Sequence, residues 1–213
     1  METFKSSDGK PILMKMVTAV QENKAYLSAV DGLIGDGDHG MNMNKGFTMF
    51  GERISEKDIT FSKGLNQLGT LLLTEIGGSM GPIYGTVFSD MGDAGEYLEE
   101  IGATELAMML AAGLDGLCDI VDARVGDKTL VDTLTPAIDA LKAAADSGKS
   151  FSAALANMKS AAAAGRDSTK DLTAKFGRSA RLGERSRGVL DAGATSCCII
   201  LTALADGIME IIG

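Results

Sequence analysis

Apolar residues recur at three- and four-residue intervals along most of this chain, and this helical periodicity is the feature that most constrains its fold. β-Branched residues do not alternate with polar ones as they do in half-buried strands, so no sheet is predicted. The segments with helical periodicity are residues 11–30, 42–54, 61–75, 82–88, 104–121, 128–145, 151–164 and 192–212. About eight helices with short connections predict an all-α fold, either a helical bundle or a barrel.

We expect the chain to form a single domain over residues 1–213. It contains no linker rich in proline and serine and no internal repeat, and its apolar share of 45% is enough for a substantial core. The net charge of −9 argues against a nucleic-acid-binding protein, because such modules usually present a basic face. Small phosphorylated ligands are still possible, since metal ions can balance their charge.

Composition also indicates the compartment. The N-terminus lacks the apolar segment of a signal peptide, and no apolar run approaches the length of a membrane span. Cys118, Cys197 and Cys198 have neither the spacing of metal ligands nor the even number of a disulfide framework, which is typical of a reducing environment. We therefore expect a soluble, cytoplasmic protein without a membrane partner.

The segment DGLIGDGDHGMN is the strongest local signal. Asp31, Asp36 and Asp38 place three carboxylates close together, and these repel one another unless a cation neutralises them. Gly35 and Gly37 allow the backbone to fold tightly enough to direct the carboxylates to one point. A site with few carboxylates and positions open to water or phosphate favours Mg²⁺ over Ca²⁺, and the residue order of a calcium EF-hand is missing. The alternative interpretation is a solvated acidic turn that caps helices.

His39 is the only histidine in the chain and lies between Asp38 and Gly40. A lone histidine is usually a structural hydrogen-bonding group, but this position also suits a contact to nucleotide or phosphate, or less directly a phosphoryl acceptor. The neighbouring acids are expected to favour its protonated form. Asn42 is expected to open the next helix and to help cap it near an anion.

Two glycine-containing segments precede predicted helices. GGSMGPIYG, residues 77–85, suits a phosphate cradle at a helix N-terminus, although a glycine-lined packing turn explains it equally well. It is not a Walker A motif, because the final Gly-Lys-Ser/Thr is absent. In VGDKTLVDTLTP, Asp127 is expected either to cap the helix that follows or to belong to a helix start, with Lys128 and Thr129, that faces the same ligand.

The segment 177–194, GRSARLGERSRGVLDAGA, concentrates arginines in an otherwise acidic chain. A run of charges usually covers a solvated surface. Arginine is also a recurrent means of stabilising a transferring phosphoryl group, and the flanking glycines suit a segment that covers a ligand. Asp191 and Gly193 follow directly before the last predicted helix. The arginines are Arg178, Arg181, Arg185 and Arg187.

Taken together, these segments form a recognisable series. D-x-x-x-x-D-x-D-H-G, GGSMGP-x-YG, GDKTLVDTL-x-P and GR-x-x-x-x-GERS-x-G-x-x-DAGA-x-S resemble, in this order, the ADP-binding L subunit of dihydroxyacetone kinases. The resemblance covers residues 11–213, nearly the whole chain. It implies an antiparallel eight-helix barrel with nucleotide-binding loops at one end.

The resemblance also implies roles for particular residues. Asp31, Asp36 and Asp38 match the ligands of two Mg²⁺ ions, and Arg178 matches the residue expected to balance charge on the transferred phosphoryl group. The implied nucleotide contacts are His39, Gly40, Met41, Asn42, Ser79, Met80, Leu130, Arg178, Asp191 and Gly193.

The activity implied is that of a phosphotransferase with an alcohol group as acceptor. The chain would hold Mg-ADP or Mg-ATP and pass a phosphoryl group to dihydroxyacetone on a separate K subunit. The expected donor is a phosphohistidine phosphocarrier protein of the phosphotransferase system. Three alternatives remain: an ATP-dependent kinase subunit for another short ketose or polyol, a regulatory module that holds nucleotide, and a calcium-binding helical protein.

Some positions depart from the family pattern. Where the phosphotransferase-system members usually read Ser-Ile-Gly-His-Gln-Asp-Pro-Gly, this chain reads SRGVLDAG, with Arg187, Val189 and Leu190 at unusual positions. Met80 stands where a small residue is common. These departures leave open the acceptor and the phosphoryl donor, but they do not affect the proposed metal site.

Overall fold

The computed structural model describes residues 2–213, and it confirms the predicted all-α class. The α-helices in this part of the chain are α1 (Lys10–Glu22), α2 (Lys24–Gly32), α3 (His39–Ile54), α4 (Phe61–Glu75), α5 (Met80–Ala94), α6 (Ala103–Ile120), α7 (Val131–Asp146), α8 (Phe151–Ser168) and α9 (Ala192–Ile212). Three short 3₁₀ helices are η1 (Ser6–Asp8), η2 (Thr169–Asp171) and η3 (Ser179–Ser186). The strands β1 (Phe4–Lys5) and β2 (Glu100–Ile101) form a small antiparallel pair with Phe4 opposite Ile101.

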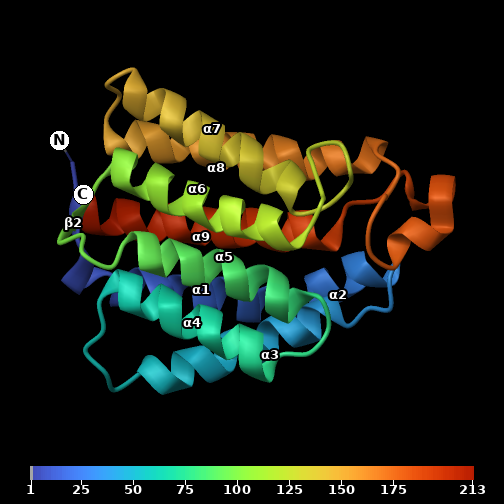
Figure 1. Cartoon of the computed structure of the whole chain (residues 1–213), viewed down its shortest axis with the longest axis horizontal. Coiled ribbons are helices and arrows are strands. Elements are labelled where there is room, and N and C mark those ends of the chain that lie inside the picture. Colours follow the sequence, from blue (N-terminus) through green and yellow to red (C-terminus); the bar gives the residue numbers. More distant parts are fainter. Residues whose placement is uncertain (1) are drawn as a thin grey trace.

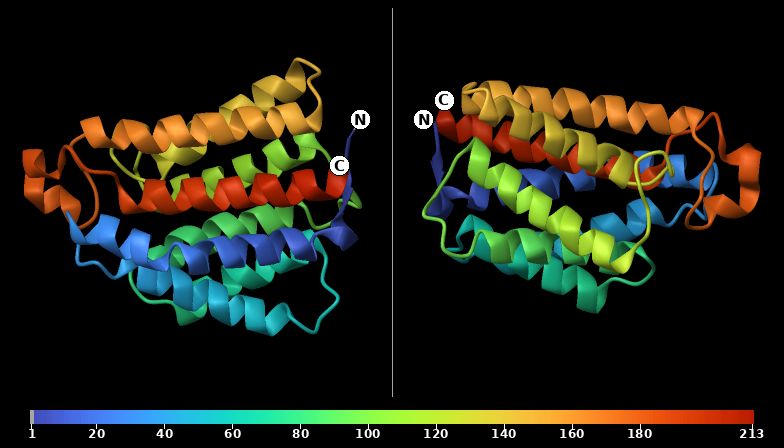
Figure 2. Two further views of the ribbon diagram at one scale, coloured as in Figure 1. Left: turned by 180° about the vertical axis from the view of Figure 1, so that it is seen from behind. Right: turned by 45° about the horizontal axis from the view of Figure 1, so that its top comes forward.

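The long helices form a closed ring (Figure 1). Around it the order is α1, α3, α4, α5, α6, α7, α8 and α9, and α9 packs against α1 to complete the circle, as the view from behind in Figure 2 shows. Successive helices run in opposite directions, and α2 extends beyond α1 to pack against α3 and α9. The described helices therefore form the antiparallel eight-helix barrel that the motifs implied.

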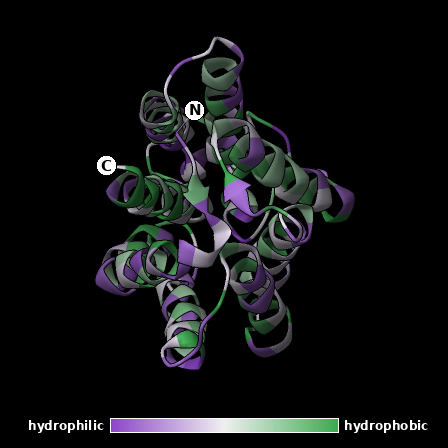
Figure 3. Cartoon of the chain, turned by 90° about the vertical axis from the view of Figure 1, so that its left-hand side faces the viewer, coloured by the Kyte–Doolittle hydropathy of each residue, from purple (hydrophilic) through white to green (hydrophobic). Residues whose placement is uncertain are grey.

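The two ends of the barrel differ. Both chain termini lie at one end, which faces the viewer in Figure 3. The connections α2–α3, α4–α5, α6–α7 and α8–α9 lie at the other end, on the right of Figure 1. These connections contain the glycine-rich segments of the sequence, so the fold gathers all of them at one place.

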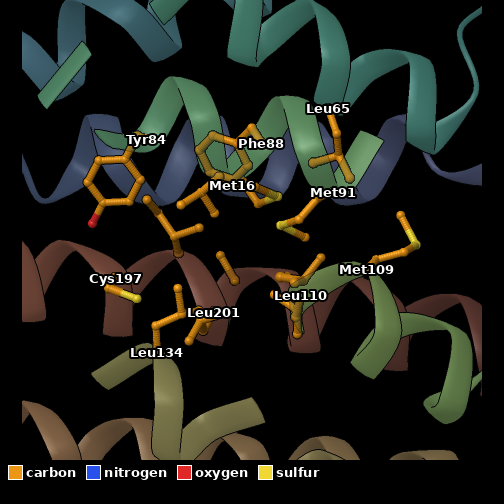
Figure 4. Packing of buried hydrophobic residues seen from close by; sticks show 14 of the residues in the cluster. Met16, Leu65, Tyr84, Phe88, Met91, Met109, Leu110, Leu134, Cys197 and Leu201 are labelled. Carbon is orange, nitrogen blue, oxygen red and sulfur yellow. The ribbon is translucent and has the colours of Figure 1, made fainter. Parts of the chain in front are cut away.

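Apolar side chains fill the inside of the ring (Figure 4). Met16 of α1, Phe88 of α5, Leu110 of α6, Leu134 of α7 and Leu201 of α9 all belong to one buried cluster. Burial of each such side chain stabilises the fold by about 1.5–3 kcal/mol. The barrel is thus a packed support for its loops and has no open channel along the described helices.

Several helix boundaries differ from the predictions. The segment 11–30 is divided at Asn23, whose side-chain amide donates to the Ala19 carbonyl oxygen at 2.8 Å and so competes with the helical hydrogen bonds. The segment 82–88 extends to Met80–Ala94, because Met91 continues the buried face beyond the polar residues that follow Phe88. Neither β1 nor β2 was predicted, since two residues are too few to show alternation.

The last helix corrects a further expectation. α9 is long and apolar enough to cross a membrane by length and composition, contrary to the prediction that no run approaches this length. Most of its apolar window is buried inside the barrel, against α1, α7 and α8. This burial is the pattern of a core helix.

Candidate functional site

A cavity of about 380 Å³ opens at the end of the barrel opposite the chain termini. Its walls come from the α2–α3, α4–α5, α6–α7 and α8–α9 connections. Four helices also begin here, α3, α5, α7 and α9, with His39, Met80, Leu130 and Ala192 at or beside their first residues among the lining groups. Each helix N-terminus carries roughly half a positive charge together with unpaired backbone N–H groups. The cavity is therefore suited to an anionic ligand.

The acidic loop, residues 31–40, forms one wall of the cavity. One carboxylate oxygen each from Asp31, Asp36 and Asp38 lies within 4.8 Å of the other two. A Cβ atom on Gly35 would collide with the Asp31 carboxylate, and Gly37 has a φ of +79°, which side chains rarely adopt. The two glycines thus bring the carboxylates together, as their spacing predicted.

The electrostatics of the acidic loop favour a cation. Burial raises the pKa of Asp38, and the neighbouring Asp36 and Asp31 carboxylates raise it further. The guanidinium of Arg178 forms an ion pair with Asp36. An arginine from a distant part of the chain therefore already supplies positive charge to this cluster. Three carboxylates without thiol or imidazole ligands among them match the preference of a hard divalent ion such as Mg²⁺.

His39 is held by a hydrogen-bonded chain of hydroxyl groups. Its Nε2 lies 2.8 Å from Ser196 Oγ, and Ser196 Oγ lies 2.7 Å from the hydroxyl oxygen of Tyr84. The Tyr84 hydroxyl also donates to the Gly193 carbonyl oxygen at 3.2 Å. Burial lowers the pKa of His39, an effect larger than the opposing influence of Asp31. Asp31 does favour the protonated imidazole, as expected of the neighbouring acids, but burial disfavours the charged form more strongly.

The other phosphate-loop candidates also reach the cavity. Gly78, Ser79 and Met80 line it at the start of α5, and Ser79 is the N-cap residue without a side-chain capping bond. The Ser79 side chain therefore leaves the backbone N–H groups in the first turn of α5 uncapped. Asn42 lies in the first turn of α3, which begins three residues earlier than predicted, and it lines the cavity without capping the helix.

The α6–α7 connection differs from its predicted form. Asp127 does not cap α7, which begins at Val131; its carboxylate accepts from the Arg124 backbone N–H at 2.8 Å and from Lys175 Nζ at 2.5 Å. Asp132 stabilises the turn before α7 instead, because its carboxylate accepts from the backbone N–H groups of Gly126 and Thr129. The alternative interpretation, a helix start that faces the ligand, agrees with the position of Leu130 in the cavity wall.

The fourth wall includes the segment before α9. Asp191 caps this helix by accepting from the Ala194 N–H at 2.7 Å, and both Asp191 and Gly193 line the cavity. Burial raises the pKa of Asp191 to about 6. Arg178 is the cavity-lining arginine of the α8–α9 connection, while Arg187 binds within that connection, to Glu184 and Thr173.

Two predicted nucleotide contacts do not line the cavity. Gly40 is buried where a Cβ atom would collide with the Lys24 carbonyl oxygen and with Ser28, so its place is in the α2–α3 packing. Met41 is 53% exposed and is not among the residues that line the cavity. All other predicted site residues lie around the cavity.

Two further residues belong to the site although sequence reasoning did not assign them a role there. Ser196 hydrogen-bonds to His39, and Tyr84 hydrogen-bonds to Ser196. Lys128, at the helix start that was expected to face the ligand, lines the cavity and is only 1% exposed. Tyr84 and Ser196 did lie inside recognised motifs, GGSMGP-x-YG and DAGA-x-S, and this was the available signal.

The arrangement can now be compared with known proteins. The family model of the DAK2 domain matches residues 33–206. The chain belongs to the DAK2 domain family. The family resemblance inferred from the motifs is thereby confirmed.

Related proteins extend this finding. The ADP-binding subunit DhaL of the PEP-dependent dihydroxyacetone kinase of Escherichia coli is 38% identical over 183 residues, which cover 84% of this chain and 86% of that protein. The ADP-binding subunit DhaL of the PTS-dependent dihydroxyacetone kinase of Lactococcus lactis is 33% identical and covers 91% and 93% of the two chains. The L-erythrulose 1-kinase of Mycolicibacterium smegmatis is also 33% identical, over 87% of this DAK2 chain but 33% of its own length.

A solved structure shares the fold. The crystal structure of the dihydroxyacetone kinase of C. freundii superimposes with a TM-score of 0.73 at 23% sequence identity. The match covers 95% of this chain and 35% of that one, so the DAK2 barrel corresponds to about a third of the larger kinase.

Proposed function

We propose that this chain is the nucleotide-binding subunit of a dihydroxyacetone-type kinase. It holds ADP or ATP with Mg²⁺ and transfers a phosphoryl group to dihydroxyacetone bound on a separate K subunit, as a phosphotransferase with an alcohol group as acceptor. The phosphoryl donor is a phosphohistidine phosphocarrier protein of the phosphotransferase system. Residues 1–213 act as one domain in this reaction, in the cytoplasm.

One observation carries the proposal: the cavity combines a carboxylate cluster with groups that attract anions. Asp31, Asp36 and Asp38 converge on one side, while four helix N-termini and Arg178 border the same space. A ligand that satisfies both sides must bring its own cations and its own negative charge. A metal-complexed nucleotide has this composition.

The residues present fit a hard divalent ion beside a diphosphate or triphosphate, and we propose two Mg²⁺ ions. Asp31, Asp36 and Asp38 would hold the metal through carboxylate oxygens, leaving the remaining coordination positions to phosphate and water. When bound, the metal neutralises charge on the phosphate oxygens. The backbone at Ser79 and Met80 and the start of α3 provide N–H donors for the phosphates.

This mechanism requires no general base from the chain. Phosphoryl transfer depends mainly on alignment and on neutralisation of charge. Arg178 is the candidate for stabilising charge on the transferred group, because its guanidinium already reaches Asp36 at the metal cluster. The Ser196 hydroxyl fixes the ring of His39, and we assign the imidazole a binding role at the phosphates.

The names of relatives support the partners. The E. coli and L. lactis relatives are ADP-binding subunits of PEP-dependent and PTS-dependent kinases, and this chain spans most of their length. Because these relatives are named as subunits of such kinases, we expect a K subunit as partner and a phosphocarrier protein as donor.

Calorimetry with Mg-ADP tests the binding step. We expect binding that is lost with a chelator and reduced at least about 100-fold, or ~2.7 kcal/mol, in Asp38→Ala. Asp58→Ala is the matched control, because Asp58 is exposed in the α3–α4 connection at the opposite end of the barrel. Nucleotide binding that is indifferent to both Mg²⁺ and Asp38 would contradict the proposal, and calcium binding without nucleotide would support the calcium-binding alternative.

Transfer is tested separately with a K subunit. Phosphoenolpyruvate with the phosphocarrier system, or ATP, is supplied, and phosphorylated dihydroxyacetone is measured. Full nucleotide affinity without transfer to any short ketose would instead support a regulatory module that holds nucleotide.

A second candidate is an ATP-dependent kinase subunit for another short ketose or polyol. The 33% identity to an L-erythrulose 1-kinase favours it, because related barrels serve a four-carbon ketose in that protein. Competition between dihydroxyacetone and erythrulose in the same transfer assay distinguishes the two acceptors.

A further inference from the structure

The arginine loop, residues 172–188, is closed at its base by a buried lysine. Lys128 Nζ donates to the Thr169 carbonyl oxygen, just before the loop, and to the Val189 carbonyl oxygen at 2.5 Å, just after it. The two strands of chain at this base also bond to each other, through Gly188 N–H to the Lys170 carbonyl oxygen at 2.7 Å and Asp191 N–H to Thr169 Oγ1 at 3.0 Å. One side chain from the α6–α7 connection therefore joins both ends of the loop.

The loop above this base is connected to Arg178. Ser186 Oγ accepts from the Ala174 N–H at 2.9 Å, and Arg187 binds Glu184 and Thr173 across the loop. These bonds tie its two sides together. Arg178, between them, extends to Asp36 in the acidic loop. Figure 2 shows this segment projecting beyond the end of the barrel. Lys175 attaches it a second time to the α6–α7 connection, by donating from its backbone N–H to the Asp127 carbonyl oxygen at 3.2 Å and from Nζ to the Asp127 carboxylate at 2.5 Å.

Local geometry indicates that Lys128 is held for this purpose. It has a φ of +62°, the left-handed conformation that favours glycine, and among the described non-glycine residues it alone has a positive φ. Asp132 fixes the backbone on both sides by accepting from the Gly126 and Thr129 N–H groups. The side chain of Lys128 is only 1% exposed, and the contacts that it makes offset the cost of this strained backbone conformation.

The position invites another interpretation, because a lysine that lines a nucleotide cavity is normally assigned to a phosphate. Two of its three N–H donors are already directed to carbonyl oxygens. Burial lowers the pKa of Lys128, and the nearby Asp191 and Asp132 carboxylates oppose part of this effect. The ammonium thus has opposite charges and carbonyl oxygens beside it within the protein itself.

We propose that Lys128 is a positioning residue that closes the base of the arginine loop and thereby holds Arg178 at the acidic loop. It acts on transfer through Arg178 and does not bind phosphate. The part that concerns transfer rests on the proposed kinase function, whereas the closure of the loop does not.

Trypsin digestion of the metal-free, nucleotide-free protein tests the closure. The exposed Arg178, Arg181 and Arg185 are cleavage sites inside the loop. Lys128→Met keeps the length of the side chain and removes its donors, and we expect cleavage within the loop to accelerate about tenfold or more. Lys159→Met is the control, because this lysine pairs with Asp206 on the outside of α8 and α9. An unchanged rate of loop cleavage in Lys128→Met would overturn the proposal, whatever the protein's activity.

A milder variant covers the case in which Lys128→Met does not fold. Lys128→Gln keeps N–H donors and removes the charge. If the donors close the loop, its cleavage rate lies between those of the wild type and Lys128→Met. If the positive charge serves a phosphate, Lys128→Gln loses Mg-ADP affinity severely while the loop stays resistant to trypsin, and this result would also overturn the proposal.

Steady-state kinetics of phosphoryl transfer test whether Lys128 acts through Arg178. We expect Lys128→Gln to lower kcat with Mg-ADP affinity changed less than about threefold, and we expect no additional loss when it is combined with Arg178→Ala. Additive losses in the double variant would mean that Lys128 acts independently of Arg178. If no transfer occurs even in the wild type, the kinase function fails while the trypsin result still decides the role of Lys128 in the loop.

Discussion

The acidic loop and the arginine loop form facing walls of one cavity, but different kinds of contact hold them. The acidic loop is closed by neighbours in sequence: Gly35 N–H donates to the Asp31 carbonyl oxygen at 2.6 Å, and His39 N–H donates to Asp31 Oδ2 at 3.3 Å. The arginine loop is held by distant residues: Lys128 bonds to carbonyl oxygens 41 and 61 residues away, and Lys175 pairs with Asp127, 48 residues away. The first wall is therefore formed by local folding, and the second by assembly of the whole barrel.

This difference matches the tasks proposed for the two walls. A metal site requires carboxylates whose separation is fixed in advance, and a short loop with two specialised glycines achieves this separation. An arginine that stabilises a transferred group must reach the ligand from outside the barrel, which requires a longer segment and a distant anchor. The Arg178–Asp36 ion pair joins the two walls.

The largest effect that separates the two walls is expected from Arg178→Ala. Because the guanidinium is proposed to act on charge in the transition state, kcat should fall about 10³-fold, the lower range known for arginines in phosphoryl transfer. Mg-ADP affinity, which depends on the acidic loop, should change less than about threefold. Steady-state kinetics of transfer and calorimetry measure the two quantities.

Arg181→Ala is the matched control, since Arg181 lies in η3, the 3₁₀ helix that Arg178 precedes as N-cap residue, and does not line the cavity. Equal losses of kcat and affinity in Arg178→Ala would remove the division of tasks between the walls. Equal losses in both arginine variants would assign the effect to the net charge of the loop.

A smaller effect is expected from a pair of glycine substitutions. Gly37 has a φ of +79° in the acidic loop and Gly183 a φ of +55° in the arginine loop, and an alanine in such a conformation costs about 1–2 kcal/mol. Gly37→Ala should weaken Mg²⁺-dependent ADP binding about tenfold, because the carboxylates lose their arrangement. Gly183→Ala should leave this binding unchanged and lower kcat. Magnesium titrations at fixed ADP measure the first effect, and the comparison fails if Gly183→Ala weakens metal binding as much as Gly37→Ala.

The same contrast explains what could be predicted from the sequence. The carboxylate cluster was predictable because Asp31, Asp36 and Asp38 are close in sequence and the glycines between them have a specific steric consequence. The barrel was predictable because helical periodicity and the ordered motifs extend along the chain. The contacts of Ser196 and Lys128 were not, since their partners are 157 residues away for Ser196 and 41 and 61 for Lys128.

Errors at the helix starts have a similar cause. Asp127 has the residue type and position of an N-cap, but Lys175 from the arginine loop pairs with it at 2.5 Å. A contact between distant segments thus replaced the local capping bond, and α7 begins later than predicted. The acidic sequence neighbours of His39 were expected to favour its protonated form, yet burial lowers its pKa more than Asp31 raises it.

The smallest effect is expected where the two walls touch. Asp36→Asn and Asp38→Asn each remove one carboxylate, but only Asp36 pairs with Arg178. In the metal-free protein, Asp36→Asn should therefore accelerate trypsin cleavage of the arginine loop, and Asp38→Asn should not. The Arg178 and Asp36 side chains are 65% and 35% exposed, so the pair is worth about 0.2–1 kcal/mol and the acceleration should be fivefold at most, roughly. High salt should reduce the difference between the variants. Equal cleavage rates at low salt would mean that the Arg178–Asp36 pair does not help to hold the loop, and the two walls would then be independent until a ligand joins them.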